Sequence, residues 1–222
     1  YLGGAGYIAI AGFYKDLDDY VYSNDAFIAD FSQFVDTELT PAQAAVLGTT
    51  LGTVSGPTNN GKGHIKGFEA TLSMPLDVVN DALSGFGFIA SGSFNDSAVY
   101  LGDNPDPITV PGLSKWIANT TVYFERSGFE ARVSHRFRSS FLAEVQGISA
   151  TRILRTSQAE SIIDAQVGYR FQSGAMEGLH IFLQANNLTD EPFITFDAGD
   201  ERRIIDYQSY GRTYLVGASY TF

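Results

Sequence analysis

The chain has 222 residues, of which 44% are hydrophobic and 14% aromatic, and a formal net charge of −11. This acidic balance argues against nucleic acid as a partner, because phosphate binding needs clustered lysine and arginine. The absence of cysteine excludes a disulfide framework and a cysteine zinc site. No run approaches the roughly 18 apolar residues of a membrane helix, so the composition fits an ordinary β protein or a membrane β-barrel.

Side chains alternate with period two in eight segments, which we expect to form strands. These segments are 6–22, 61–74, 86–99, 115–126, 129–141, 157–171, 179–188 and 210–222. The links between them alternate in length along the chain. The short links are 75–85, 127–128 and 172–178, and the long links are about 23–60, 100–114, 142–156 and 189–209.

This alternation predicts an all-β fold, a transmembrane antiparallel up-and-down β-barrel. Alternate turns of a meander lie at the same end, and outer-membrane barrels have short periplasmic turns and long extracellular loops. Most of the segments are also longer than the about 5–6 residues of a usual soluble strand. The alternative is a soluble β-sandwich, whose strands are short and recur every 8–12 residues.

The segments 86–99, 129–141 and 157–171 each separate an apolar face from a polar one, as expected for lipid on one side and a wet lumen on the other. In 129–141 the apolar side chains Phe129, Ala131, Val133 and Phe137 alternate with charged ones. The predicted lumen-facing residues are Glu130, Arg132, Arg136, Arg138, Asp164 and Arg170. Both faces of 6–22 are apolar, so the pattern does not assign them.

Three of the four long links are acidic, and one of these three carries a helix signal. Residues 24–60 contain four acidic residues and neither lysine nor arginine. Within that link, Thr40 is a good N-cap, Pro41 suits the first helical position and Gly48 can end the helix. We therefore expect a short helix at 41–47 in an extracellular loop.

The sequence offers little support for an enzyme or a metal site, and we nominate no catalytic residue, cofactor or metal ligand. The three histidines lie on separate predicted strands, and no G-x-S-x-G motif is present. The acidic stretches KDLDDY (15–20) and DAGDER (197–202) contain calcium-type ligands, but neither fits the spacing of a known calcium loop. Solvated acidic loops are the favoured interpretation.

Two stretches near the C-terminus, LHIFLQANNLTDEPF (179–193) and YGRTYLVGASYTF (210–222), resemble the end of TonB-dependent outer-membrane receptors. Those receptors show a late strand finishing in N-N-L-T-D, a loop, and then G-R-T with a terminal strand ending in an aromatic residue. The stretches 63–76 and 116–139 are also similar to this family, in particular to the proteobacterial branch often associated with carbohydrate uptake. The resemblance covers nearly the whole chain.

The resemblance implies that residues 1–222 form the last eight strands of a 22-stranded barrel, without the N-terminal plug domain. It also implies that the six predicted lumen-facing residues face that plug in the whole receptor. It implies a TonB–ExbB–ExbD complex as partner through that plug, the rest of the barrel, and the lipid and lipopolysaccharide of the bacterial outer membrane. It also implies that the aromatic C-terminus, with Tyr220 and Phe222, is read by the barrel-assembly machinery.

The function implied is active import of a scarce solute, and the acidic loops favour a neutral one such as an oligosaccharide over an anionic chelate. Aromatic side chains and planar polar groups in the long loops are the candidate sugar-binding residues. They are Phe27, Phe31, Phe34, Tyr100, Asp103, Asn104, Asp106 and Trp116.

Three alternatives remain open at this point. The first is a receptor that carries a ferric siderophore or another metal chelate in place of a sugar. The second is a complete eight-stranded outer-membrane barrel that acts as an enzyme or adhesin, since barrels of this kind have even strand numbers. A soluble β-sandwich that binds a ligand is the third.

Overall fold

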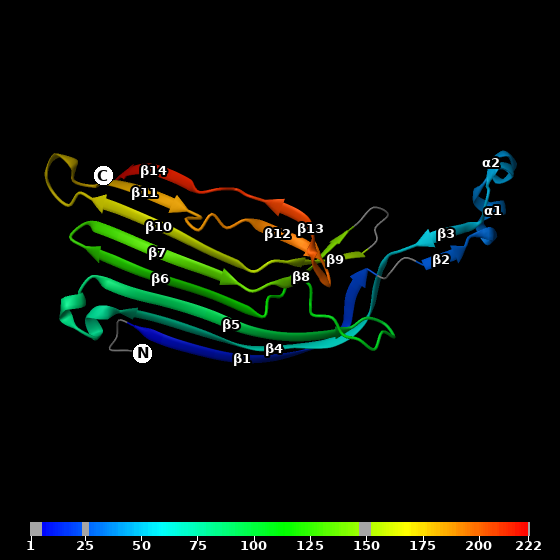
Figure 1. The fold of residues 1–222 in the computed structure, drawn as a ribbon, viewed down its shortest axis with the longest axis horizontal. Coiled ribbons are helices and arrows are strands. Elements are labelled where there is room, and N and C mark those ends of the chain that lie inside the picture. The colour runs from blue at the N-terminus through cyan, green and yellow to red at the C-terminus, as the bar shows by residue number, and fades with distance from the viewer. Residues whose placement is uncertain (1–5, 24–26, 147–151, 222) are drawn as a thin grey trace.

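The structure is a computed structural model that describes residues 6–23, 27–146 and 152–221. Eight long strands form one antiparallel sheet in which every strand pairs with its neighbours along the meander, in the order β1-β4-β5-β6-β7-β10-β11-β14 (Figure 1). The strands are β1 Tyr7–Ser23, β4 Pro57–Pro75, β5 Phe86–Tyr100, β6 Trp116–Arg126, β7 Phe129–Arg138, β10 Glu160–Arg170, β11 Leu179–Asn186 and β14 Thr213–Tyr220. All eight predicted strands and their order are confirmed.

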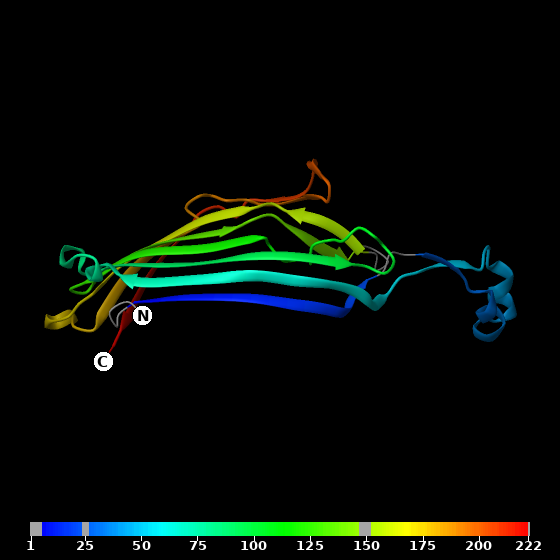
Figure 2. The same cartoon turned by 90° about the horizontal axis from the view of Figure 1, so that it is seen from below.

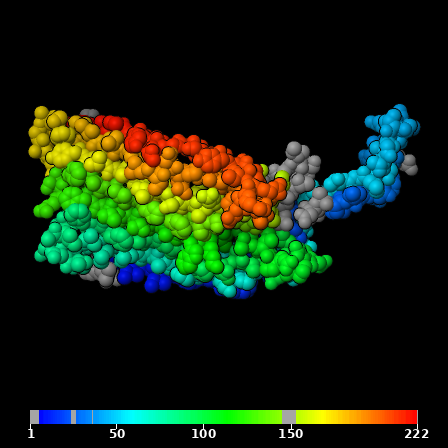
Figure 3. All heavy atoms as spheres, viewed as in Figure 1, coloured from blue at the N-terminus to red at the C-terminus, as the bar shows by residue number. Residues whose placement is uncertain are grey.

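The sheet is an open wall whose edge strands are β1 and β14. It is bowed in the view of Figure 2, and its strands pack side by side into a continuous surface in Figure 3. The short links lie together at one end, here called the short-turn end, and the long links leave from the opposite, long-loop end. The alternation of short and long links along the chain therefore corresponds to the two ends of the sheet, as predicted.

The links at the short-turn end are compact. Short 3₁₀ turns fill two of them, at Leu76–Val78, Asp81–Leu83 and Gly174–Met176. The third is a two-residue hairpin in which Ser127 and Gly128 both have positive φ, at 51° and 81°. A two-residue hairpin with positive φ at both central positions matches the right-handed twist of the strands it joins.

The longest link forms an arm, residues 27–54, that extends beyond the long-loop end in both Figures 1 and 2. It consists of β2 Phe27–Asp30, α1 Ser32–Glu38, α2 Pro41–Val46 and β3 Leu51–Val54, with β2 paired to β3. The predicted helix is confirmed as α2, and Thr40 accepts a hydrogen bond from the backbone N–H of Gln43 as its N-cap.

Two details of the arm differ from expectation. The helix α2 ends at an extended Leu47, and Gly48 has no positive φ, so no left-handed glycine closes it. The helix α1 was not predicted because its N-cap position is Phe31, which offers no capping side chain.

A second sheet of four strands, called here the loop sheet, joins two of the long links, for which the sequence pattern predicted no strands. It consists of β8 Phe141–Gln146, β9 Arg152–Ser157, β12 Phe193–Asp197 and β13 Asp200–Gln208, in the order β13-β12-β9-β8. Its formation shortens two predicted strands: β7 ends at Arg138 instead of 141, and β10 begins at Glu160 instead of 157. The chain leaves the main sheet there to enter the loop sheet.

The pairing register separates two continuous faces across the main sheet, because directly opposed residues of antiparallel strands share a face. On one, the apolar face, Phe94 opposes both Phe68 and Trp116, and Val133 opposes Val122 and Ala165. The register also settles the faces of β1. Ile8, Ile10, Gly12 and Tyr14 oppose Leu72, Ala70, Phe68 and Lys66, so they belong to the apolar face.

The apolar face is exposed. Among the described residues, the buried hydrophobic side chains are Val99 and Phe196 alone, whereas Val133 is 51% and Val216 80% exposed. A soluble sheet buries such a face against a second layer, because exposed apolar area costs about 25 cal/mol per Å² in water. The apolar side chains of the described main sheet are instead largely exposed, so this face is suited to a non-aqueous solvent.

Aromatic side chains gather at two levels of the apolar face. At the short-turn end the Phe86 and Phe124 rings lie 4.6 Å apart, and the Phe124 and Phe129 rings 6.0 Å apart. Toward the long-loop end the Phe94 ring lies 4.7 Å from Trp116 and 5.5 Å from Phe68. The side chains between these two aromatic belts are mostly small or aliphatic, with Phe88 and the polar His135 among them.

The belts are spaced for a bilayer. Phe86 and Phe94 both lie on β5, and the eight residue steps between them span about 27 Å at about 3.4 Å each. A tilt of about 40° reduces this to roughly 21 Å across the membrane, close to the about 25 Å apolar band of outer-membrane barrels with its aromatic girdles.

Candidate functional site

The polar face carries all six residues predicted to face the lumen or plug. Glu130, Arg132, Arg136 and Arg138 alternate with the apolar residues of β7, and Asp164 and Arg170 do so on β10. They do not form one cluster. They divide into separate groups along the length of the sheet.

The group nearest the short-turn end centres on Glu130. Its Oε1 accepts a hydrogen bond from Gln166 Nε2 at 3.2 Å and lies 3.1 Å from His180 Nε2. His180 is 8% exposed and stacks on Phe182 with ring centroids 5.5 Å apart. Glu130 and His180 come from the strands on either side of β10, and they meet above Gly168. A Cβ at that glycine would lie 2.7 Å from His180 Nε2 and 2.9 Å from Glu130 Oε1, so the contact depends on glycine there.

The middle groups are ion pairs. Arg136 Nη2 lies 3.2 Å from Asp164 Oδ2, and Arg132 Nη2 lies 3.5 Å from Glu125 Oε1. The Arg136 side chain is 59% exposed and that of Arg132 56%, so each pair contributes little to stability. Both guanidinium groups retain donors that can bind a further partner.

Arg138 joins the main sheet to the link 101–115. Its Nε donates to Ser114 Oγ at 2.6 Å and its Nη2 to the carbonyl of Gly112. Its guanidinium also lies 3.7 Å from the centroid of the Phe141 ring, at the start of the loop sheet. Arg138 therefore holds the long-loop end together instead of presenting a free charge.

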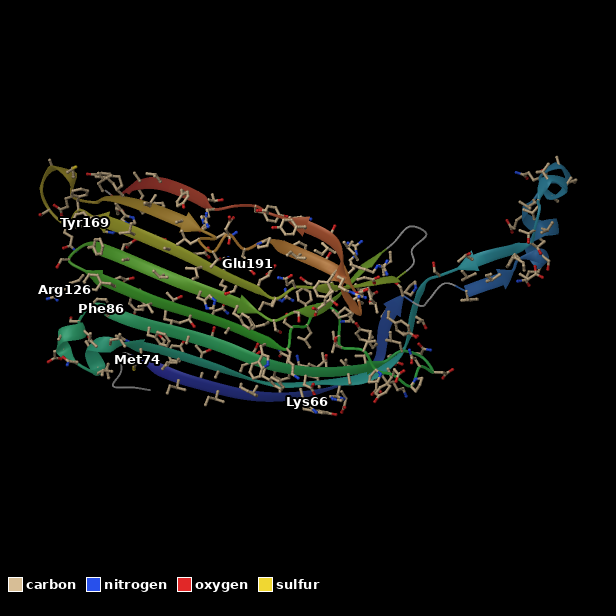
Figure 4. All side chains as sticks on the ribbon, in the orientation of Figure 1. Lys66, Met74, Phe86, Arg126, Tyr169 and Glu191 are labelled. Atoms are coloured by element: carbon tan, nitrogen blue, oxygen red, sulfur yellow. The ribbon has the colours of Figure 1, made fainter. Side chains whose placement is uncertain are left out.

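A cavity of about 350 Å³ opens on the polar face where the link 187–212 leaves β11. The Arg136–Asp164 pair forms part of its wall, and Glu191 of the link lies above β10 and β11 (Figure 4). Seven of its eleven lining residues carry charged or amide groups, and two carry aromatic rings. The lining residues are Arg136, Glu160, Ile162, Asp164, Asn186, Asn187, Glu191, Pro192, Phe193, Gln208 and Tyr210.

Asn187, the second asparagine of the N-N-L-T-D motif, shapes this cavity. Its Nδ2 donates to the carbonyls of Glu191 at 3.2 Å and Gly211 at 3.3 Å, while its Oδ1 accepts from the Glu191 N–H at 2.9 Å. Its own N–H donates to Asp164 Oδ1 at 2.9 Å. Its φ is 54°, a left-handed conformation that asparagine tolerates better than most residues.

Arg212 of the G-R-T motif completes the same junction. Its Nε donates to the Leu188 carbonyl at 3.0 Å, and its Nη1 lies 3.8 Å from Asp190 Oδ2. The two C-terminal motifs therefore tie the start of the link 187–212 to its end. The sequence singled out both motifs, but it gave no indication that they frame a cavity.

The loop sheet is held by a second junction. Arg155 Nη1 lies 2.6 Å from Asp206 Oδ2, and the same oxygen accepts a hydrogen bond from Thr195 Oγ1 at 2.8 Å. Thr195 is 5% and Ser157 1% exposed, so this sheet has a small polar interior. The contact fixes β9 and β13 across β12 and so couples two long links.

The predicted sugar-binding residues lie in different parts of the structure. Phe31 and Phe34 lie in the arm, with ring centroids 6.2 Å apart, and line an apolar cavity of about 290 Å³. Phe27 is 52% exposed on β2 and does not line that cavity. Asp30, at the end of the same strand, accepts hydrogen bonds from Thr50 and Ser32, which lower the pKa of its carboxyl below the usual value.

The other predicted sugar-binding residues lie at the base of the long links. Asp103, Asn104 and Asp106 are exposed in one turn, in which the Asp106 N–H donates to Asn104 Oδ1 at 3.0 Å. Tyr100 opposes Lys62, and Trp116 opposes Phe94, so both lie on the apolar face. Trp116 is part of the aromatic belt, away from the polar-face cavity, because the register of β6 directs it to the opposite side of the sheet.

Of the two predicted assembly residues, Tyr220 opposes Leu179 and lies on the apolar face at the short-turn end, and Phe222 lies outside the described residues. Within the described ranges, no helix is both long and apolar enough to cross a membrane. In the same part of the chain, no three His, Cys, Asp or Glu side chains gather in an arrangement able to hold a metal ion.

Comparisons with known proteins agree with this geometry. The family model described as "TonB dependent receptor-like, beta-barrel" matches residues 1–188. The solved structure of the unliganded ferric citrate transporter FecA superposes with a TM-score of 0.56 at 19% sequence identity, over 72% of this chain and 25% of that one. A search of curated protein sequences gave no significant match.

The chain thus spans about a quarter of the solved receptor, and at this level of identity the likeness concerns the fold. The family match covers most of the chain, including every main-sheet strand up to β11. From the family model and the strand architecture together, the chain belongs to the TonB-dependent receptor-like β-barrel family.

Proposed function

We propose that this chain is part of the barrel wall of a receptor in the bacterial outer membrane that imports a scarce solute by TonB-dependent active transport. The observation that carries the proposal is the pair of opposite faces on one eight-stranded sheet. One face is apolar, exposed and bounded by two aromatic belts, and the other is lined by charged and amide side chains. Family membership supports the same reading.

In this proposal the apolar face contacts lipid and the polar face lines the lumen. The rest of a 22-stranded barrel continues from β1, and an N-terminal plug occupies the lumen. A TonB–ExbB–ExbD complex supplies the motive force through that plug, and the barrel-assembly machinery inserts the chain through its C-terminal strand. Transport requires no covalent chemistry, so the chain needs no catalytic group.

We infer that the solute is a neutral oligosaccharide, on the basis of the cavity framed by Asn187. One arginine, Arg136, faces three acids there, Glu160, Asp164 and Glu191. This balance disfavours an anionic solute. Planar amides and carboxylates can satisfy sugar hydroxyl groups, and the exposed ring of Tyr210 can pack against the apolar side of a sugar.

A ferric siderophore or other metal chelate is the second candidate solute. Four arginines on the polar face, of which Arg132 and Arg136 are more than half exposed, could guide an anionic chelate along the lumen. FecA is a ferric citrate transporter, and its likeness to this chain extends to the fold. The two candidates differ in the charge of the solute and can be separated by uptake.

The test is uptake by cells that express the full-length receptor, with and without an active TonB complex. Labelled short neutral oligosaccharides and ferric citrate serve as probes. We expect TonB-dependent accumulation of an oligosaccharide, and loss of apparent affinity in Tyr210→Ala. The matched control is Tyr207→Ala, which removes another exposed tyrosine of the same link that does not line the cavity.

Each outcome separates the candidates. Accumulation of ferric citrate alone would replace the sugar by a chelate and leave the transporter proposal intact. Uptake of any probe that persists without TonB would overturn active transport. An equal loss in Tyr207→Ala and Tyr210→Ala would show that the cavity is not the solute site.

A further inference from the structure

A short row of polar side chains crosses the middle of the apolar face. Thr120 of β6 opposes His135 of β7, and each is two residues from the Val122–Val133 pair of that face. His135 Nε2 lies 2.9 Å from the hydroxyl oxygen of Ser161 on β10, which shares the face. We call Thr120, His135 and Ser161 the polar row. Figure 1 shows its three strands in the middle of the eight-stranded sheet.

The polar row lies at the depth of the hydrocarbon. On β6, Thr120 is four residues from Trp116, in the aromatic belt toward the long-loop end, and four residues from Phe124, in the belt at the short-turn end. Since aromatic girdles mark the two membrane interfaces, Thr120 and its neighbour His135 lie midway between them. A histidine at this depth is rare in membrane proteins and usually faces protein or water instead of lipid.

Part of the hydrogen-bonding capacity of the polar row is unused. In the described part of the chain, Ser161 is the one side-chain partner of His135, and the hydroxyl group of Thr120 has none. A hydroxyl group can donate and accept, and an imidazole ring has two nitrogens that donate or accept. Because acyl chains offer no partner, contact of these groups with lipid costs free energy. A protein surface with a donor and an acceptor at the same depth would remove that cost.

Small residues next to the polar row allow such a surface to approach closely. Ala90 of β5 opposes Thr120, and Gly92 opposes Ala118 one residue pair nearer the long-loop end. The strands of a barrel wall are tilted by about 40°, so the strands of two facing walls cross and touch over a small area only. Small side chains at that place let two backbones pack together within a membrane.

A second copy of the receptor fits this surface by symmetry. Two copies inserted in the same direction are related by a two-fold axis along the membrane normal, and this axis keeps every residue at its own depth. The polar row of one copy therefore meets the polar row of the other. His135 of each copy then faces Thr120 of the other, and both side chains offer a donor and an acceptor. The row is thus its own complement.

We propose that the receptor forms a symmetric dimer in the outer membrane through β5, β6 and β7, with the polar row at the centre of the interface. This inference rests on the proposed function, because it needs the apolar face to lie in a membrane. The polar face takes no part in the contact. Each copy therefore keeps its own solute path and its own cavity framed by Asn187.

The experiment measures dimerisation of the full-length receptor in lipid vesicles. Donor and acceptor dyes are attached to Asp103→Cys, an exposed position of the link 101–115, and energy transfer is followed as protein is diluted with lipid. The test variant is Thr120→Val, which keeps the shape of the side chain and removes its hydroxyl group. The matched control is Thr121→Val, since Thr121 lies on the polar face, where its hydroxyl oxygen is 2.9 Å from that of Ser134.

We expect the dissociation constant of the dimer to rise roughly sevenfold in Thr120→Val. A hydrogen bond between membrane segments changes an association constant about threefold, and the two-fold axis creates the bond twice. Thr121→Val should associate like the unmodified receptor. A receptor that stays monomeric at every dilution would overturn the proposal, and so would equal dissociation constants for the two variants.

Photocrosslinking in native outer membranes identifies what covers the polar row. A photoreactive group on Ala118→Cys should give a product of twice the receptor mass. The same group on Ala218→Cys, which opposes Ile181 on the apolar face of β14, should give no such product. A product of another mass at Ala118 would show that a different protein covers the row. That result, or equal amounts of dimer from both positions, would contradict the proposed interface.

Membrane fractionation of the same cells separates the two failures. If the receptor lies in the outer membrane and remains monomeric, only the dimer proposal falls. If the receptor is absent from the outer membrane, the proposed function falls with it.

Discussion

The cavity on the polar face should depend on Asn187 more than on any other single side chain. Its carboxamide makes three hydrogen bonds of 2.9–3.3 Å to backbone groups of Glu191 and Gly211. Its Oδ1 also accepts a fourth hydrogen bond, from Thr189 Oγ1 at 3.3 Å. At about 0.5–1.5 kcal/mol net for each bond, and with three of them long, Asn187→Gly should cost about 2–3 kcal/mol. Asn187→Ala should cost about 1 kcal/mol more, because alanine resists the positive φ.

The loss should be local, since the eight-stranded sheet does not depend on this junction. Hydrogen exchange of the receptor in detergent measures it. A destabilisation of about 3 kcal/mol corresponds to roughly a hundredfold faster exchange. We expect this increase in the amides of 188–193 and 210–212, together with weaker solute binding. Amides of β5 and β6 serve as the internal control.

Asn187→Asp sharpens the test, because aspartate keeps the acceptor oxygen and the tolerance of positive φ but loses both donors. It should fall between the unmodified chain and Asn187→Gly. If Asn187→Gly exchanges like the unmodified chain, backbone conformation alone shapes the link, and the role assigned to the carboxamide is wrong.

Three further predictions concern the sheet and the arm. Gly168→Ala should separate His180 from Glu130 and lower the free energy of unfolding by about 1 kcal/mol, measured in urea; unchanged stability would contradict the contact. Trp116→Ala should lower barrel stability by about 1–2 kcal/mol and leave the apparent affinity of uptake unchanged, and a fall in affinity at full stability would return Trp116 to the solute site. The hydrogen bonds that lower the pKa of Asp30 stabilise the arm above the unfolded pKa of about 3.9, and this stability is lost as pH falls through the lower folded value. Exchange within the arm, corrected for intrinsic rates, should therefore accelerate only below about pH 4, and acceleration between pH 7 and 5 would refute this.

Most of the main sheet could be predicted because each strand carries its own signal. Alternation marks β5, β7 and β10 individually, and link length orders them without any knowledge of tertiary contacts. The faces of β1 could not be read, since both are apolar. They follow only from pairing, which places Tyr14 opposite Lys66.

The loop sheet could not be predicted because its strands are short and pair with distant segments. Thr195 opposes Ser157 across links that lie far apart in sequence, and both are buried polar residues that no hydrophobic pattern reveals. The same reason applies to the candidate site. The polar-face residues were predictable from alternation, whereas the cavity depends on Asn187 folding a link back over β10 and β11.

The central claim is that one face of this sheet meets lipid and the other meets water. Single cysteines introduced at Ile162–Val167 of a cysteine-free full-length receptor, each carrying a nitroxide label, test it most directly. Accessibility to oxygen should peak at Ile163, Ala165 and Val167, and accessibility to a water-soluble nickel chelate at the positions between them, with a period of two along β10. Equal access of the nickel chelate to both sets would show that water bathes both faces and would contradict the membrane wall.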